Sequence, residues 1–118
     1  MKVNTELISK IIKELGISAN LSGYYYIRYA IGLTVNDITL VNGITTVIYP
    51  TVAKEFDTTP TRVEKGIRHA IENGWVKANY EFADKLFGYS VDARKGKPTN
   101  SEFIAMIADK LRLELKSA

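Results

Sequence analysis

The sequence of 118 residues contains no cysteine and only one histidine. The lack of cysteine excludes a disulfide scaffold, a cysteine nucleophile and a thiolate zinc site, and the lone histidine has no second histidine with which to hold a metal. Long hydrophobic runs are also absent: the richest apolar stretch, Tyr24–Leu33, is shorter than the about 20 residues of a membrane span and contains Arg28. The polar start of the chain does not resemble a signal peptide. We therefore expect no membrane association and a cytoplasmic location.

The net charge is small, at +3, but it is unevenly distributed along the chain. Residues 61–98 contain eight Lys or Arg and five Asp or Glu, whereas residues 1–60 and 99–118 are each neutral. A local excess of positive charge suggests an anionic partner. The hydrophobic content of 46% and the charged content of 25% are typical of a globular protein, and the length fits a single domain over residues 1–118.

Hydrophobic residues recur at helical spacing along most of the chain, which predicts an all-α fold of about six helices. The expected helices cover residues 5–15, 21–33, 44–56, 60–76, 80–86 and 99–115. Gly16 follows the first helix, where a left-handed residue is expected, and Pro50 predicts a kink or a new start within the third. Thr99 and Glu102 have the spacing of a capping box at the start of the last helix.

The third and fourth helices together have the layout of a helix-turn-helix over about residues 44–76. The turn is Asp57–Thr59, and Pro60 favours the first helical position, which makes Thr59 the N-terminal cap of the fourth helix. Ala53 is small enough for the two helices to cross closely. Residues 42–49 are rich in β-branched side chains, so a strand remains an alternative there.

The fourth helix is amphipathic on a helical wheel. Its apolar face carries Val63, Ile67, Ala70, Ile71, Gly74 and Trp75, and its polar face carries Arg62, Lys65, Arg68, His69, Glu72 and Asn73. In a recognition helix such a polar face lies in the major groove of DNA, where Arg contacts guanine and Asn or Glu reads adenine or cytosine. The alternative is a solvated, ion-paired surface in which Arg68 pairs with Glu72.

Glu64 is the ambiguous residue of this helix. It lies toward the buried side of the wheel and follows Thr61 at the spacing of a capping box, so it is either a base reader or a cap. The full set of predicted DNA-binding residues is Thr61, Arg62, Glu64, Lys65, Arg68, His69, Glu72 and Asn73. Candidate phosphate contacts follow in the basic segment 88–98, namely Arg94, Lys95 and Lys97.

No catalytic motif accompanies this surface, and we expect no enzyme activity, no cofactor and no metal site. Gly96-Lys97 lacks the other residues of a phosphate-binding loop, and no serine stands in a nucleophile-elbow context. Two alternatives to DNA binding remain: a helical interaction module that binds an acidic partner with the same face, and an RNA-binding domain that stacks bases on Tyr24-Tyr25-Tyr26. Three successive helical residues point in three directions, which favours packing roles for these tyrosines.

Several longer strings resemble one family closely. They are residues 49–56 (YPTVAKEF), Arg62-Val63-Glu64, residues 67–72 (IRHAIE), Trp75, residues 86–89 (LFGY) and residues 97–106 (KPTNSEFIAM). These strings resemble the C-terminal effector domain of the stage-zero sporulation response regulators, and the resemblance covers essentially the whole chain.

The resemblance implies a six-helix DNA-binding domain that follows a phosphorylatable receiver domain and a linker, neither of which lies within these 118 residues. It implies binding to TGTCGAA-like boxes and the activation or repression of genes for entry into sporulation. Carried onto matching positions, Arg62 and Glu64 read bases, and Arg68 and His69 contact bases or phosphates. Position 65 is usually arginine in the family, and Lys65 lacks the fork with which arginine binds guanine.

The resemblance also implies protein partners. In the intact regulator, phosphorylation of the receiver drives dimerisation, and a tandem homodimer then binds adjacent boxes head to tail. The sigma factor of RNA polymerase is a further implied partner. Phe87 is the best candidate for this contact, and Phe82 and Val91 lie in the same region.

Overall fold

The computed structural model of the chain describes residues 5–76, 81, 85–86 and 96–117. Within these residues it contains five α-helices, one 3₁₀ helix and one π-helical turn, and no strand. In chain order they are α1 (Thr5–Glu14), α2 (Ser22–Asn36), η1 (Ile38–Gly43), η2 (Ile44–Ile48), α3 (Tyr49–Glu55), α4 (Pro60–Trp75) and α6 (Asn100–Ser117). The all-α prediction is confirmed.

The described residues contain five α-helices where the sequence predicts about six. The predicted helix 80–86 lies mostly outside the described residues, which include only Glu81, Lys85 and Leu86 of it, all helical. The segment 42–49, where a strand was the alternative, is helical throughout. Pro50 stands in the first turn of α3, directly after the π-helical turn, because a proline there costs no backbone hydrogen bond. The predicted new start at this proline is confirmed.

The predicted end of the second helix at Leu33 is wrong, since α2 continues to Asn36. The additional turn, residues 34–36, is helical because its two β-branched side chains are buried. Thr34 and Val35 are 0% and 4% exposed, and the hydroxyl of Thr34 donates to the carbonyl of Ala30 at 2.8 Å. Packing against the rest of the domain therefore overrides the weak helical preference of these residues.

The end of α1 follows the sequence pattern. Gly16 has a φ of +85°, in the left-handed region that glycine adopts without strain. The N–H of Ile17 then donates to the carbonyl of Ile12 at 3.1 Å, which closes the helix end as in a Schellman motif. The left-handed glycine predicted at this position is confirmed.

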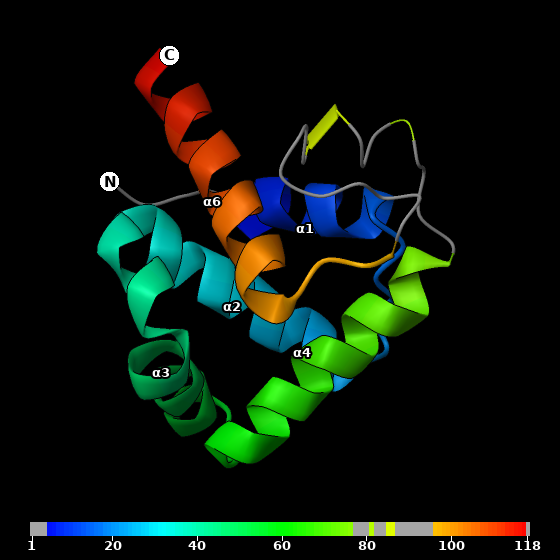
Figure 1. Cartoon of the computed structure of the whole chain (residues 1–118), viewed down its shortest axis with the longest axis vertical. Coiled ribbons are helices and arrows are strands. Elements are labelled where there is room, and N and C mark those ends of the chain that lie inside the picture. The colour runs from blue at the N-terminus through cyan, green and yellow to red at the C-terminus, as the bar shows by residue number, and fades with distance from the viewer. Residues whose placement is uncertain (1–4, 77–80, 82–84, 87–95, 118) are drawn as a thin grey trace.

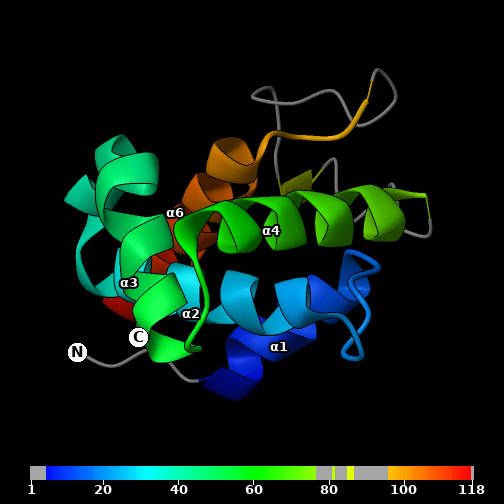
Figure 2. The ribbon, with the colours of Figure 1, turned by 90° about the horizontal axis from the view of Figure 1, so that it is seen from below.

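Helix α2 lies at the centre of the fold and packs against α1, α3, α4 and α6 (Figures 1 and 2). Its buried side chains include Ile27, Ala30 and Ile31, all at 0% exposure. Two glycines allow α2 and α4 to cross closely, since a Cβ built on Gly23 would lie 2.1 Å from the carbonyl oxygen of Gly66. This close crossing holds one face of α4 on the core and leaves the other face outside.

Candidate nucleic-acid interface

The turn between α3 and α4 brings these helices together in a V at one edge of the molecule (Figure 1). Asp57 is left-handed, with a φ of 53°, and the N–H of the next residue donates to the carbonyl of Ala53 at 2.9 Å. Thr59 caps α4, because its hydroxyl accepts a hydrogen bond from the N–H of Arg62 at 3.2 Å, and Pro60 follows it. The predicted helix-turn-helix, its turn and its cap are therefore present.

Helix α4 buries the face that the helical wheel assigns to the core. The buried residues are the six predicted ones, Val63, Ile67, Ala70, Ile71, Gly74 and Trp75. The residues exposed after Pro60 are Thr61, Arg62, Lys65, Arg68, His69, Glu72 and Asn73. Glu64 is half-buried, which agrees with its place between the two faces. The structure thus brings all eight candidate DNA-binding residues onto one helix, while their contact with DNA stays a prediction.

Both carboxylates of this surface are in ion pairs. Glu64 Oε1 lies 3.5 Å from Arg68 Nη1, and Glu72 Oε1 lies 3.5 Å from Lys97 Nζ. Arg68 therefore pairs with the acid that precedes it by one turn, and Glu72 pairs with a lysine that lies just before α6. This is not the Arg68–Glu72 pair that the sequence offers as the alternative.

Glu64 does not cap the N-terminus of α4. Thr59 is the N-cap, so Thr61 lies inside the helix and the competing capping box does not form. In the described part of the chain, Arg62 and Lys65 have no carboxylate within ion-pair distance. Their charges are therefore available to an anionic partner at the exposed face of the first two turns.

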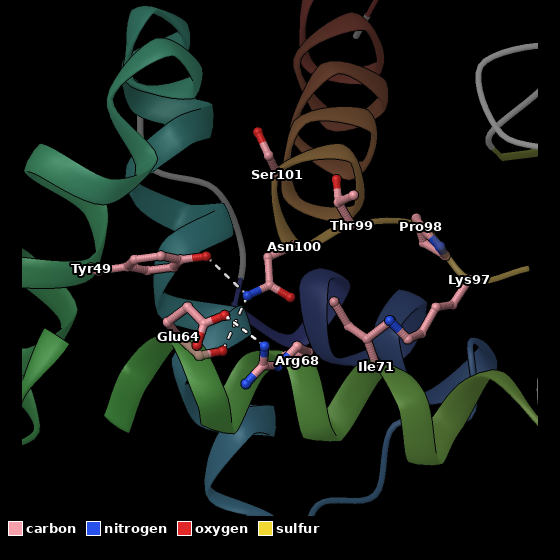
Figure 3. Close-up of a pocket in the computed structure, with 9 residues that line it drawn as sticks. All are labelled: Tyr49, Glu64, Arg68, Ile71, Lys97, Pro98, Thr99, Asn100 and Ser101. Carbon is pink, nitrogen blue, oxygen red and sulfur yellow. Dashed lines mark hydrogen bonds and ion pairs between the residues drawn. The ribbon is translucent and has the colours of Figure 1, made fainter. Parts of the chain in front are cut away.

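A hollow of about 300 Å³ lies between α4 and the start of α6, and Figure 3 shows the residues that line it. The side-chain amide of Asn100 donates to the hydroxyl of Tyr49 on α3 at 2.9 Å and to the backbone carbonyl of Glu64 on α4 at 3.1 Å. Helix α6 begins with the predicted capping box, in which Thr99 and Glu102 exchange hydrogen bonds of 2.9 and 3.1 Å. The first residue of α6 is thus bonded to both helices of the helix-turn-helix.

Tyr49 and Asn100 are residues of this site that the sequence reasoning missed, although both lie in strings that resemble the family. Tyr49 is 7% exposed. Burial raises the pKa of Tyr49 above its usual 10.0, the hydrogen bond from Asn100 opposes this rise, and the carboxylate of Glu64 adds to it. The hydroxyl of Tyr49 is therefore neutral at physiological pH, and its oxygen accepts the hydrogen bond from the amide of Asn100.

Other predicted site residues lie outside the described residues. They are the candidate phosphate contacts Arg94 and Lys95 and the candidate sigma-factor contacts Phe82, Phe87 and Val91. Lys97 is described and exposed, and its ion pair with Glu72 places it next to α4.

The tyrosine run of α2 does not form one stacking surface. Tyr24 is 2% exposed and Tyr25 is 38% exposed, while Tyr26 packs edge-on against Phe56 with ring centroids 5.3 Å apart. The three side chains have three different surroundings, as the helical geometry predicts.

No helix of the described residues is long and apolar enough to cross a membrane. No three of their His, Asp or Glu side chains lie close enough together to hold a metal ion.

Residues 8–111 match the model of the family described as sporulation initiation factor Spo0A C terminal. The chain belongs to this family. The match includes the whole helix-turn-helix and the start of α6 that is bonded to it. Spo0A C-terminal domains are DNA-binding regulatory domains rather than enzymes, so the chain is a sporulation-related DNA-binding domain. The resemblance of the sequence strings to this family is confirmed.

Proposed function

We propose that α4 of this Spo0A C-terminal domain lies in the major groove of TGTCGAA-like boxes, and that Arg62, Glu64 and Lys65 read bases there. The observation that carries this proposal is the surface of the first two turns of α4. Arg62 and Lys65 are exposed and lack a carboxylate partner among the described residues, on a helix whose opposite face is buried. The N-terminal turns of a recognition helix are the part that contacts base edges.

The ion pair between Glu64 and Arg68 does not prevent this readout. The two side chains are 33% and 50% exposed, so water screens their attraction, and a pair of this kind stabilises by about 0.2–1 kcal/mol. One good base contact supplies about 1–3 kcal/mol, which exceeds the cost of opening the pair. Opening frees Glu64 to read a base, and it frees Arg68, next to His69, to contact bases or phosphates.

The remaining polar residues of α4 and the basic segment before α6 have a supporting role in the proposal. Thr61, Glu72 and Asn73 flank the base-reading residues along the exposed face. Lys97, with Arg94 and Lys95, contacts phosphates. The ion pair of Lys97 with Glu72 supports this role for Lys97, because it holds this lysine beside the recognition helix. Phosphate contacts of this kind set the orientation of a protein on DNA without selecting sequence.

Two further parts of the proposed function rest on family membership. Copies of the domain bind tandem boxes head to tail as a homodimer, and Phe82, Phe87 and Val91 contact the sigma factor of RNA polymerase. Phe87→Ala is then expected to lower activated transcription in a purified polymerase assay while box binding is unchanged. Loss of box binding in this variant would instead assign Phe87 to the core.

Fluorescence anisotropy titrations with three nucleic acids test the DNA-binding proposal. They are a duplex with one TGTCGAA-like box, a duplex of the same composition with the box scrambled, and a single-stranded RNA. Each changed base pair of a specific site is expected to weaken binding by about 1–3 kcal/mol. Equal affinity for the two duplexes would overturn base readout, and preference for the RNA would indicate a different nucleic-acid ligand.

A further inference from the structure

The surface formed by α1 and α2 contains two hollows that meet at Arg28. The smaller, of about 440 Å³, lies along α1, and the larger, of about 610 Å³, lies between α1, α2 and the end of α3. Figure 2 shows α2 between α4 and α1, so this surface and the exposed face of α4 lie on different sides of the molecule. A partner bound here leaves α4 free to bind DNA.

Arg28 is held in place between the hollows, and it has no ion-pair partner among the described residues. Its side chain is half-buried, and its guanidinium carbon lies 5.5 and 5.3 Å from the ring centroids of Tyr24 and Tyr25. Nη1 donates to Ser9 Oγ at 3.1 Å. No carboxylate of the described residues lies within ion-pair distance of the guanidinium. A guanidinium has five N–H donors. Because that of Arg28 is held in place and has no acid beside it in the described part of the chain, it is suited to bind an external carboxylate or phosphate.

The two hollows differ in chemistry. The smaller is basic, because the described residues that line it include Lys10, Lys13 and Arg28 and one carboxylate, that of Glu6. The larger is lined partly by apolar side chains, among them those of Leu33 and Phe56. Phe56 is 38% exposed, which is unusual for a phenylalanine, and it can take up an apolar group from a partner.

We propose that this surface binds an acidic segment of a partner protein. A carboxylate of the segment pairs with Arg28 and with the two lysines, and an apolar side chain beside it enters the larger hollow at Phe56. A nucleic acid fits less well, because a phosphate backbone that follows both hollows would pass the carboxylates of Glu6 and Glu55. A peptide carries only a few charges, so its acidic side chains can lie in the smaller, basic hollow while its apolar side chains lie in the larger one.

The test uses a short fluorescent peptide in which Asp and Glu alternate with Leu at helical spacing, and a matched peptide with Asn and Gln in their place. The domain is first saturated with box duplex, so that the cations of α4 are occupied. The acidic peptide is expected to bind and the amide peptide is not. Arg28→Gln should weaken peptide binding by about tenfold, since a hydrogen bond to a charged group is lost. Lys54→Gln, at an exposed lysine on α3 that lines neither hollow, is the control and should change nothing.

A second variant separates binding from folding. Lys10 and Lys13 are exposed, so the double change to Gln leaves the core intact and should still weaken peptide binding. Equal binding of the two peptides, no binding of the acidic peptide at low salt, or an effect of Lys54→Gln as large as that of Arg28→Gln would each overturn the proposal. If Arg28→Gln instead lowered the salt dependence of duplex binding and left peptide binding unchanged, the surface would be one for nucleic acid.

Discussion

Arg62 offers the most direct test of base readout by α4. Its side chain is exposed and lacks a carboxylate partner among the described residues, and only its backbone N–H takes part in the cap with Thr59. Replacement by alanine therefore removes a guanidinium but no core contact. We expect the free energy of unfolding of Arg62→Ala to change by less than about 0.5 kcal/mol, as measured by urea unfolding.

The effect on DNA is expected to depend on the sequence of the duplex. Loss of a two-pronged contact to guanine costs about 1–3 kcal/mol, which is a factor of about 5 to 150 in the dissociation constant for a box duplex. On a scrambled duplex the affinity should fall by no more than the contribution of one phosphate contact. The slope of log K against log salt concentration should then change by less than about 1. Anisotropy titrations of both duplexes at several salt concentrations measure the two quantities.

Lys110→Ala is the matched control for Arg62→Ala. It also removes one cation, but from the C-terminal half of α6, which points away from the edge formed by α3 and α4 (Figure 1). Its ion pair with Glu114 is partly exposed, so the fold should tolerate the change. Equal losses on the two duplexes would show that Arg62 contacts a phosphate, and no loss on either would remove it from the interface. Both results would refute its role in base readout.

Three further changes test other parts of the site. Lys65→Arg introduces a guanidinium, which can make two hydrogen bonds to guanine where lysine cannot. It should tighten binding to the box duplex more than to the scrambled one in the same titrations. Replacing the basic residues of 94–97 by alanine should lower the salt slope by up to about 3, and an unchanged slope would exclude them from the interface. In urea unfolding, Asn100→Ala should cost about 1–3 kcal/mol, because it leaves a nearly buried hydroxyl and a helix carbonyl without their donor, and a neutral result would contradict the bonded role of Asn100. The pKa of Tyr49 in the folded state is raised above 10.0, so its neutral hydroxyl stabilises the fold fully below pH 10, and this contribution is lost as the pH rises further. The free energy of unfolding of Tyr49→Phe, measured by urea unfolding, should therefore fall less above pH 10 than that of the unchanged domain.

The helix ends of this site could be predicted because their hydrogen bonds are local. Thr59 bonds to a residue three positions later, and Thr99 and Glu102 bond to each other at the same separation. The buried face of α4 was equally accessible, since a period of 3.6 residues places side chains on faces without reference to the rest of the chain. Sequence reasoning failed at the end of α2, where the burial of Thr34 and Val35 outweighs their local preference.

The pairing of charges on α4 was not predictable from the helix alone. By spacing, Arg68 has an acid one turn before it, Glu64, and another one turn after it, Glu72. In the structure, Glu72 pairs with Lys97, which is 25 positions further along the chain, and Arg68 pairs with Glu64. An acid one turn before a cation is the favoured order within a helix, which agrees with the pairing of Arg68 with Glu64. The partner of Glu72 is a residue that only the folded chain brings to this face.

The sequence by itself determined that the chain is helical, where the turn between α3 and α4 lies, and which side of α4 faces outward. Each of these depends on residues a few positions apart. The tertiary structure decided how α4 is held and how its charges are paired, through the contact of Gly23 with Gly66 and the bonds from Asn100 to both helices. It also placed the guanidinium of Arg28 over two tyrosine rings, with no carboxylate of the described residues within ion-pair distance. Such contacts depend on how helices cross, which is set by the packing of the whole core and not by any short stretch of sequence.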